Sequence, residues 1–225
     1  MQGNQSGQNA AGRGTSLNPP NRYESLHRAA AEEGEQQLEG QGGEDGAVSP
    51  TRTQVLPDES CSIISSNNSP DIPFLHSVNA YRGCEHGCAY CYARPSHEQL
   101  GMSAGLDFEA KIVVKHDAAT LLRRRLCKAT WRGEPIAMSG VTDCYQPIER
   151  RLKITRGILQ VMCEAGQAGM ICTKNALVLR DLDVLVELAR WGLVRVTLSL
   201  TTLDAKLARV LEPRTSTPAV RLRAI

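Results

Sequence analysis

The sequence predicts an α/β fold with a parallel sheet. From residue 61 onward, short apolar segments rich in β-branched residues alternate with amphipathic helical segments. Such alternation is typical of right-handed β/α units whose strands lie parallel to one another. Polar residues directly follow several of the apolar segments, at the strand ends where parallel sheets place ligand sites. These observations predict a β/α core with a site at one edge of its sheet.

The expected strands are short, apolar and flanked by turn-forming residues. Residues 62–65 and 72–78 are predicted as short strands or an extended lead-in, and 74–81 as the first strand of the core. The later strands are expected at 112–115, 135–139, 169–173 and 194–200. Helical spacing predicts helices at 95–100, 118–128, 147–165, 182–191 and 204–211, with another beginning at 217–218.

Three cysteines lie close together at Cys84, Cys88 and Cys91, in the spacing C-x3-C-x2-C. Random placement of eight cysteines in 225 residues gives this spacing roughly 0.007 times per chain, so coincidence is a poor explanation. Thiolates are soft ligands that suit zinc or an iron–sulfur cluster. We therefore expect a metal centre between the first strand and the helix after it.

The number of local ligands bears on which metal is bound. A structural zinc ion is nearly always closed by four protein ligands, so His86, His97 or a distant cysteine would have to join the three cysteines. A four-iron cluster held by three cysteines leaves one iron open to a small molecule. A disulfide framework is disfavoured, because the chain is not small and shows no secretory signal. The zinc and iron–sulfur hypotheses both stay open on the cysteines alone.

Composition argues against several classes of function. A formal charge of +2 gives no global basic field for nucleic acid, and 4% aromatic residues give few platforms for stacking bases. The sequence has no run of about 18 apolar residues, so we expect no membrane-spanning helix. Because the start also lacks a secretory signal, we expect a cytoplasmic protein.

Residues 1–60 differ from the rest and are expected to form a largely disordered arm. Gly, Gln, Asn, Ser and Glu dominate there, so the segment buries too little apolar surface to offset its ordering entropy. Residues 12–23 are less random, and their prolines favour an extended path. This part either docks on the folded core, expected at 61–225, or stays a solvated tail.

Polar residues at the ends of the expected strands form the candidate site. They are Ser139, Gly140, Thr142, Asp143, Thr173, Lys174 and Ser199. Because the C-terminal ends of parallel strands meet at one edge, we expect these residues near the cysteines that follow the first strand. Asp143 either orients a bound cofactor or substrate, or caps a helix. Cys127, Cys163 and Cys172 fall on core-facing positions and are expected to be small buried apolar residues.

Several longer motifs accompany the cysteine spacing. They are Gly12-Arg-Gly, Asn18-Pro-Pro-Asn-Arg-Tyr-Glu24, Ser69-Pro-Asp-Ile, Tyr81 to Pro95, Gly105-Leu-Asp-Phe-Glu109, Gly140 to Glu149 and Thr202-Leu-Asp. With the cysteines, they resemble the radical S-adenosylmethionine (radical SAM) superfamily, in a bacterial branch similar to spore photoproduct lyase. The resemblance implies a partial (β/α) TIM-like barrel, with about four β/α units in this chain. Members of the branch continue well past residue 225, so we expect a C-terminally truncated core.

The resemblance also implies a [4Fe–4S] cluster on Cys84, Cys88 and Cys91, with S-adenosyl-L-methionine bound at its open iron. Tyr90 matches the aromatic residue that usually precedes the third cysteine. Cys144 stands where the branch usually has proline. Since photoproduct lyases use a cysteine as hydrogen-atom donor, Cys144 is the candidate catalytic residue.

Other cofactor contacts follow from the same resemblance. Ser139 and Gly140 match a turn near the methionine amino group of the cofactor. Lys174 matches a lysine near the methionine carboxylate, and Ser199 matches a contact to the ribose.

The function implied is that of an enzyme. One-electron reduction, by a partner such as flavodoxin or ferredoxin, cleaves S-adenosylmethionine to a 5′-deoxyadenosyl radical that abstracts a substrate hydrogen. Lyase or repair chemistry on a nucleic acid is the nearest analogy, and modification of a peptide or small molecule is the rival. A zinc-stabilised binding module and an inactive cluster-binding fragment remain as alternatives, and neither would release 5′-deoxyadenosine.

Overall fold

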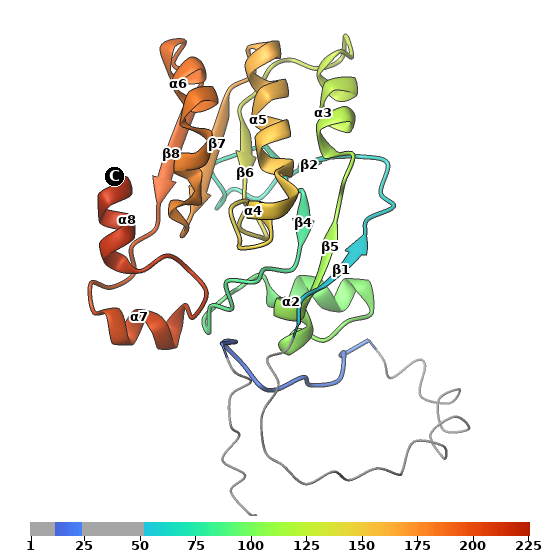
Figure 1. Ribbon diagram of the computed structural model, residues 1–225. Coiled ribbons are helices and arrows are strands. Elements are labelled where there is room, and N and C mark those ends of the chain that lie inside the picture. The colour runs from blue at the N-terminus through green and yellow to red at the C-terminus, as the bar shows by residue number, and fades with distance from the viewer. Residues whose placement is uncertain (1–11, 24–51) are drawn as a thin grey trace, which may run out of the picture.

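The computed structural model describes residues 12–23 and 52–225, and Figure 1 shows their arrangement. Strands and helices alternate along the chain, and most strand pairs of the larger sheet are parallel. The predicted α/β class is therefore confirmed. The sequence predicts disorder for most of residues 1–60, and this prediction falls largely on residues that lie outside the described ones.

The larger sheet has five strands in the order β2-β3-β6-β7-β8. Four of them are parallel, namely β3 (His76–Val78), β6 (Ile136–Met138), β7 (Gly169–Thr173) and β8 (Val194–Leu198). Strand β2 (Ile64–Ser66) joins the edge antiparallel to β3. The C-terminal ends of the parallel strands therefore lie along one edge of the sheet, as the alternating pattern predicts.

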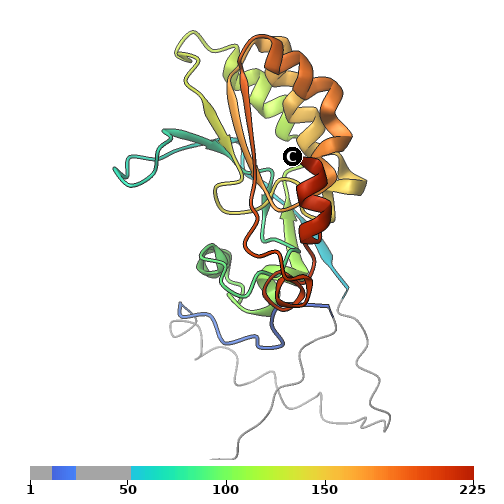
Figure 2. The same ribbon diagram turned by 90° about the vertical axis from the view of Figure 1, so that its left-hand side faces the viewer.

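Three helices cover one face of this sheet side by side, as Figures 1 and 2 show. They are α3 (Ala118–Leu126), α5 (Ile154–Ala165) and α6 (Leu182–Arg190). Apolar side chains from the strands and helices form one buried cluster, which includes Leu122, Ile136, Ile158, Ile171 and Leu188. Burial of such a side chain stabilises the fold by about 1.5–3 kcal/mol. This layer fixes the strand ends rigidly relative to one another.

A second, three-stranded sheet lies beside the first. Strand β5 (Lys111–Val114) pairs in parallel with β1 (Gln54–Pro57) and antiparallel with β4 (Tyr81–Arg82). The segment expected as a strand at 112–115 thus does not join the larger sheet; it forms the smaller sheet with β1 and β4. Strand β1 also lies before residue 60, where the sequence places the end of the arm.

The remaining helical elements lie in the connections between strands or follow β8. They are η3 (Arg94–Leu100), α2 (Leu106–Ala110), α4 (Glu149–Leu152), η4 (Ala176–Asp181), α7 (Ala205–Leu211) and α8 (Pro218–Ala224). Asp204 caps α7, because its carboxylate accepts the backbone N–H groups of Lys206 and Leu207. Asp117 precedes α3 as expected, but its side chain makes no capping bond with the described residues.

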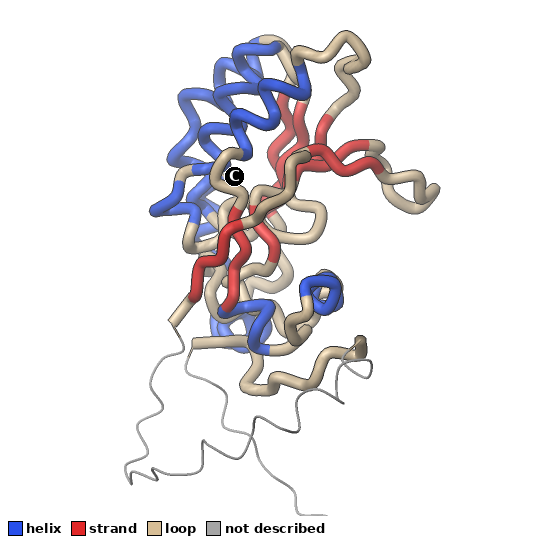
Figure 3. The backbone as a smooth tube through the Cα atoms, turned by 90° about the vertical axis from the view of Figure 1, so that its right-hand side faces the viewer, coloured by secondary structure: helices blue, strands red, loops and turns tan. Residues whose placement is uncertain are grey.

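Residues 12–23 dock on the folded core, where they run past α2 and η3 (Figure 3). Of the two alternatives for this segment, the docked arm is the one that the structure has. Within the described residues, no helix is both long enough and apolar enough to cross a membrane.

Candidate functional site

The three cysteines of the motif line one cavity of about 140 Å³. They belong to the cysteine loop, residues 83–92, which connects β4 to η3. Gly83 and Gly87 have φ values of +86° and +66°, which glycine adopts without steric cost. These turns fold the loop back on itself, so that Cys84 and Cys88 are buried and Cys91 is partly exposed.

Burial changes the acidity of these thiols. It raises the pKa of Cys88 to about 12 and the pKa of Cys84 well above its usual value. Both side chains are therefore protonated thiols at neutral pH in the absence of a ligand. A bound metal takes thiolates, so its binding here would release protons.

The other wall of the cavity comes from the C-terminal ends of three strands. Every strand-end residue predicted from the sequence lines it: Ser139, Gly140, Thr142, Asp143, Thr173, Lys174 and Ser199. The parallel register of β6, β7 and β8 brings these ends together. The structure thus joins the two sequence signals, the cysteines and the polar strand ends, around one space.

The turn after β6 has an unusual backbone. Ser139 has a φ of +82°, a conformation that costs a non-glycine residue about 1–2 kcal/mol. Its Oγ accepts the backbone N–H of Cys144 at 3.0 Å, and the hydroxyl of Tyr92 donates to the carbonyl of Gly140. These bonds hold the strained turn so that its backbone faces the cysteine loop.

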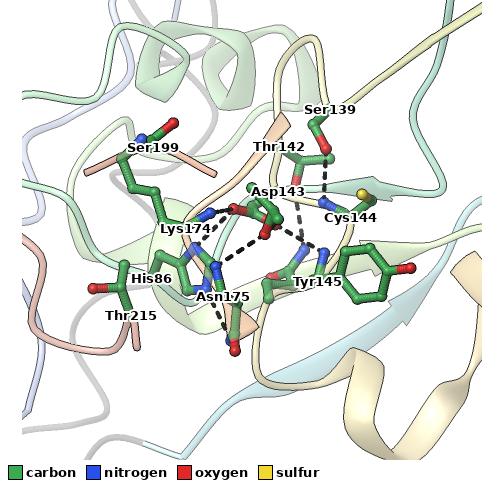
Figure 4. A network of polar contacts seen from close by, with 12 residues as sticks. His86, Ser139, Thr142, Asp143, Cys144, Tyr145, Lys174, Asn175, Ser199 and Thr215 are labelled. Carbon is green, nitrogen blue, oxygen red and sulfur yellow. Dashed lines mark hydrogen bonds and ion pairs between the residues drawn. The ribbon is translucent and has the colours of Figure 1, made fainter. Parts of the chain in front are cut away.

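Asp143 is the centre of a polar network at the base of the cavity, drawn in Figure 4. Its carboxylate accepts the hydroxyl of Thr173 at 2.7 Å and the backbone N–H of Lys174 at 2.9 Å. Oδ2 also lies 3.3 Å from Nδ1 of His86, in the cysteine loop. Burial alone would raise the pKa of Asp143, but His86 and the donated hydrogen bonds hold that pKa below its usual value. The network fastens the loop to the sheet through an ionised carboxylate.

Lys174 supplies the positive charge of the cavity. Burial alone would lower its pKa, but the Cys88, Tyr90, Glu212 and Asp143 side chains raise the pKa above its usual value. Its Nζ lies 5.8 Å from the centre of the Tyr90 ring. A cavity with this ammonium group favours a ligand that carries a carboxylate or another anion.

Tyr90 lies beside the cavity and does not line it. Its ring is about half exposed, and its hydroxyl donates to Glu212 and lies 3.1 Å from Oγ1 of Thr201. The residue therefore connects the cysteine loop to the segment between β8 and α8. Its contact with Lys174 is its link to the site.

Neither nearby histidine is positioned as a fourth zinc ligand. The two ring nitrogens of His86 each lie 3.3 Å from a partner, Asp143 on one side and Asn175 on the other. His97 is fully buried outside the cavity, with its ring edge-on against Phe108. Among the described residues, no three His, Cys, Asp or Glu side chains converge as the ligands of one ion.

Cys144, like Tyr90, is a predicted site residue that does not line the cavity. It is 3% exposed, belongs to the apolar cluster under the sheet, and is not among the residues that line the cavity. Burial raises the pKa of its thiol well above the usual value. The Cys144 side chain therefore lies in the core, and this placement argues against a role as hydrogen-atom donor.

Five cavity-lining residues fall outside the predicted cysteine and strand-end set, namely His86, Tyr92, Ala93, Val141 and Cys172, and of these the sequence offers only His86, as a possible zinc ligand. His86 and Tyr92 lie inside the cysteine motif, where alternation gives no signal about orientation. Cys172 is exposed and lines the cavity, and Cys127 is exposed as well, so the expectation of burial is wrong for both. Period-two alternation in β7 could have placed Cys172 correctly, because its neighbour Ile171 is buried against the helices.

Comparison with known proteins identifies the family. A model of the Radical SAM superfamily matches residues 78–225, which include the cysteine loop and the three strand ends. The chain belongs to the radical SAM superfamily. The resemblance seen in the cysteine spacing and the longer motifs is thereby confirmed.

Several curated relatives of this radical SAM chain carry the name uncharacterized protein. One from Mycobacterium bovis and one from Mycobacterium tuberculosis are each 41% identical over 158 residues, covering 70% of this chain and 46% of the relative. One from Methanocaldococcus jannaschii is 30% identical over 148 residues, covering 66% of this chain and 52% of the relative. The chain thus spans about half the length of the curated relatives it matches.

Solved structures show which radical SAM fold the chain has. Spore photoproduct lyase complexed with dinucleoside spore photoproduct matches with a TM-score of 0.55 at 16% identity, covering 84% of this chain and 52% of that chain. A variant of the lyase with bound AdoMet and the same dinucleoside matches with a TM-score of 0.52 at 18% identity, again over 84% and 52%. At such identities the likeness shows the fold alone.

Proposed function

We propose that this chain is the cofactor-binding part of a radical SAM enzyme. In this proposal Cys84, Cys88 and Cys91 hold a [4Fe–4S] cluster, and the polar strand ends hold S-adenosylmethionine. One observation carries the proposal: the three cysteines line the same cavity as the ends of β6, β7 and β8. Membership of the superfamily supports it independently.

The donor set fits a cluster better than a zinc ion. The cavity offers three soft sulfur ligands, and His86, the nearest nitrogen donor, is engaged through both ring nitrogens. A zinc ion would need a fourth protein ligand that brings all donors within about 2.3 Å of one point. A cluster spreads its three cysteines over separate irons and leaves the remaining iron for the cofactor.

In this proposal, residues of the chain bind and orient S-adenosylmethionine. Lys174 places its ammonium group for the methionine carboxylate, and the backbone of Ser139 and Gly140 faces the amino group. Ser199 offers its hydroxyl to the ribose, and Tyr90 flanks Lys174. Asp143 accepts the backbone N–H of Lys174 and contacts His86, so it fixes the strand end and the cysteine loop in one arrangement. Thr142 and Thr173 support the same wall through their hydroxyl bonds to Gly83 and Asp143.

The bound cofactors supply the radical chemistry. A cluster held here and reduced by one electron would supply the electron that cleaves S-adenosylmethionine to methionine and a 5′-deoxyadenosyl radical. That radical takes a hydrogen atom from the substrate. The protein contributes binding, orientation and the exclusion of water. A flavodoxin or ferredoxin would deliver the electron, and we propose a cytoplasmic setting for the reaction.

For the substrate, we propose a nucleic acid that undergoes lyase or repair chemistry. This proposal rests on the fold likeness to spore photoproduct lyase, which was solved with a dinucleoside photoproduct. The formal charge of +2 adds no support from electrostatics. Modification of a peptide or small molecule stays the rival, and stimulated cofactor cleavage by one substrate class would decide between them.

Anaerobic reconstitution tests the proposal. We expect the chain to take up iron and labile sulfide and, after reduction with dithionite, to release 5′-deoxyadenosine from S-adenosylmethionine. Stoichiometric zinc without labile sulfide would show a zinc-stabilised module. Cluster uptake without 5′-deoxyadenosine would show a cluster-binding fragment that lacks activity. The triple variant with Cys84, Cys88 and Cys91 replaced by alanine is the matched control for non-specific iron.

A further inference from the structure

Residues 12–23, here named the clasp, hold themselves against the core by specific hydrogen bonds. The carbonyl of Leu17 accepts the backbone N–H of Leu106 at 2.8 Å, at the start of α2. The side-chain amide of Asn21 donates to the carbonyl of Glu98 at 2.8 Å, in η3. Figures 1 and 2 show the clasp, in blue, passing beneath α2. Its C-terminal part is thus anchored on the two helices that follow the cysteine loop.

The N-terminal part of the clasp touches the cysteine loop, backbone against backbone. A Cβ atom placed on Gly14 would lie 1.7 Å from the carbonyl oxygen of Gly87. Gly87 lies between the cluster cysteines Cys84 and Cys88 and has a φ of +66°. Such an approach is open to glycine alone, because a side chain at position 14 would push the two backbones apart.

Glu109 joins the clasp to the loop electrostatically. It is fully buried, its Oε2 accepts the backbone N–H of Gly14 at 2.9 Å, and its Oε1 pairs with Arg94. Arg94 in turn donates to the carbonyl of Cys88 at 3.0 Å. An unbroken series of charge-assisted bonds therefore runs from the clasp to the main chain of a cluster cysteine.

A second series reaches the beginning of the loop. Arg13 is 5% exposed and donates to the carbonyl of Glu109 and, at 2.9 Å, to Oγ1 of Thr53. The Thr53 hydroxyl donates to Glu85, which follows Cys84, and Arg214 pairs with the same carboxylate at 3.2 Å. The clasp thus approaches the loop directly at Gly87 and is connected to Glu85 through Thr53.

We propose that the clasp is a positioning element for the iron–sulfur cluster, acting through Gly14 and Glu109 on the backbone of the cysteine loop. The inference rests on the proposed function, because it concerns the cluster held by that loop. Held by the clasp, the loop presents Cys84, Cys88 and Cys91 in the arrangement that binds the cluster. Without it, the loop opens more often, and the cluster is lost more readily.

Two variants test the proposal. Gly14→Ala introduces the methyl group that meets Gly87, and Glu109→Gln keeps the size of the side chain while removing the charge that pairs with Arg94. Arg22→Ala is the matched control, because Arg22 belongs to the clasp but pairs with Glu98, away from the cysteine loop. Thermal unfolding midpoints confirm that each variant folds.

The first readout uses the cluster-free protein. Alkylation of each cysteine is followed by mass spectrometry, with exposed Cys61 as internal reference. Both test variants should alkylate Cys88 and Cys91 about tenfold faster than the parent, the size expected from losing one charge-assisted hydrogen bond. The rates in Arg22→Ala should equal those of the parent.

The second readout uses the reconstituted holoprotein. Loss of iron to a chelator should be about tenfold faster in both test variants, as is usual when groups that support metal ligands are removed. The electron paramagnetic resonance spectrum of the reduced cluster should also differ from that of the parent. Parental alkylation rates with parental iron loss in both variants overturn the proposal. A parent that takes up no iron and sulfide overturns the proposed function instead, and the alkylation rates then still decide whether the clasp holds the loop.

Discussion

The carboxylate of Asp143 lies 3.3 Å from the imidazole of His86, so the end of strand β6 is bound to the middle of the cysteine loop. The same carboxylate accepts the backbone N–H groups of Tyr145 and Lys174 at 2.8 and 2.9 Å. One partly buried side chain therefore holds three segments that surround the cavity. Figure 4 shows these contacts converging on Asp143.

Replacement of Asp143 by asparagine should loosen this junction. The asparagine amide keeps one acceptor oxygen but carries no charge to face His86. Its NH₂ group replaces an oxygen that accepts a hydrogen bond, so a donor there would face another donor. We expect the free energy of unfolding to fall by about 1–3 kcal/mol, with poorer retention of iron. Urea unfolding of the cluster-free protein and iron analysis of the holoprotein measure the two effects. Asp183→Asn, at an exposed pair with Arg156, should change neither.

Lys174→Met should weaken cofactor binding and leave the cluster in place. The change removes the ammonium group from the cavity but keeps a side chain of similar length. Loss of one charge-assisted contact corresponds to an affinity for S-adenosylmethionine lower by about tenfold to a hundredfold. Anaerobic calorimetry on the holoprotein measures it, with Lys206→Met, on exposed α7, as the control. Equal affinities in Lys174→Met and the parent would remove Lys174 from the proposed binding site.

Local signals in the sequence determine most of the fold. The apolar run between Gly169 and Thr173 predicts β7 with its observed bounds, because flanking turns limit it on both sides. The strand-end position of Lys174 and Ser199 follows from the same alternation, and both line the cavity. Periodicity indicates which side of an element is apolar. The parallel β/α connections then bring the strand ends to one edge of the sheet.

Contacts between segments far apart in the chain leave no such signal. The approach of Gly14 to Gly87 depends on missing side chains, and a glycine in a sequence is equally compatible with many loops. Strand β5 has the pattern of a core strand, yet it pairs with β1, and only the three-dimensional structure separates the two sheets. Cys144 follows the turn at Ser139, whose φ is +82°, and strand alternation does not describe which way a residue after such a turn points.

Cys144→Ala should leave cofactor cleavage unchanged. The thiol is buried in the apolar cluster and does not line the cavity. Removing its sulfur should lower the free energy of unfolding by about 1 kcal/mol through the small cavity left behind. The rate of 5′-deoxyadenosine formation and the urea midpoint are the measurements. A folded variant that no longer forms 5′-deoxyadenosine would restore Cys144 to the catalytic residues.

The docking of the clasp should weaken in acid through Asp107. Its Oδ1 accepts the amide of Asn18 in the clasp at 3.0 Å, and its Oδ2 lies 3.1 Å from Nζ of Lys111. Burial alone would raise the pKa of Asp107, but the bonds from Lys111, Ser103 and Asn18 hold it below the ordinary value of 3.8. A carboxylate whose pKa is lower in the folded state stabilises the fold above its unfolded-state pKa, and this contribution disappears as pH falls through the folded-state value.

Asp107→Asn isolates this contribution from the other carboxylates of the chain. The parent should be more stable to urea than the variant at pH 5 and above, and the difference should shrink once the pH falls below the ordinary value of 3.8. Near neutral pH the difference should be constant, because the carboxylate is fully ionised in both states there. A difference that stays the same down to pH 2 would mean that the amide loses packing or hydrogen bonds, and that the charge of Asp107 does not hold the clasp.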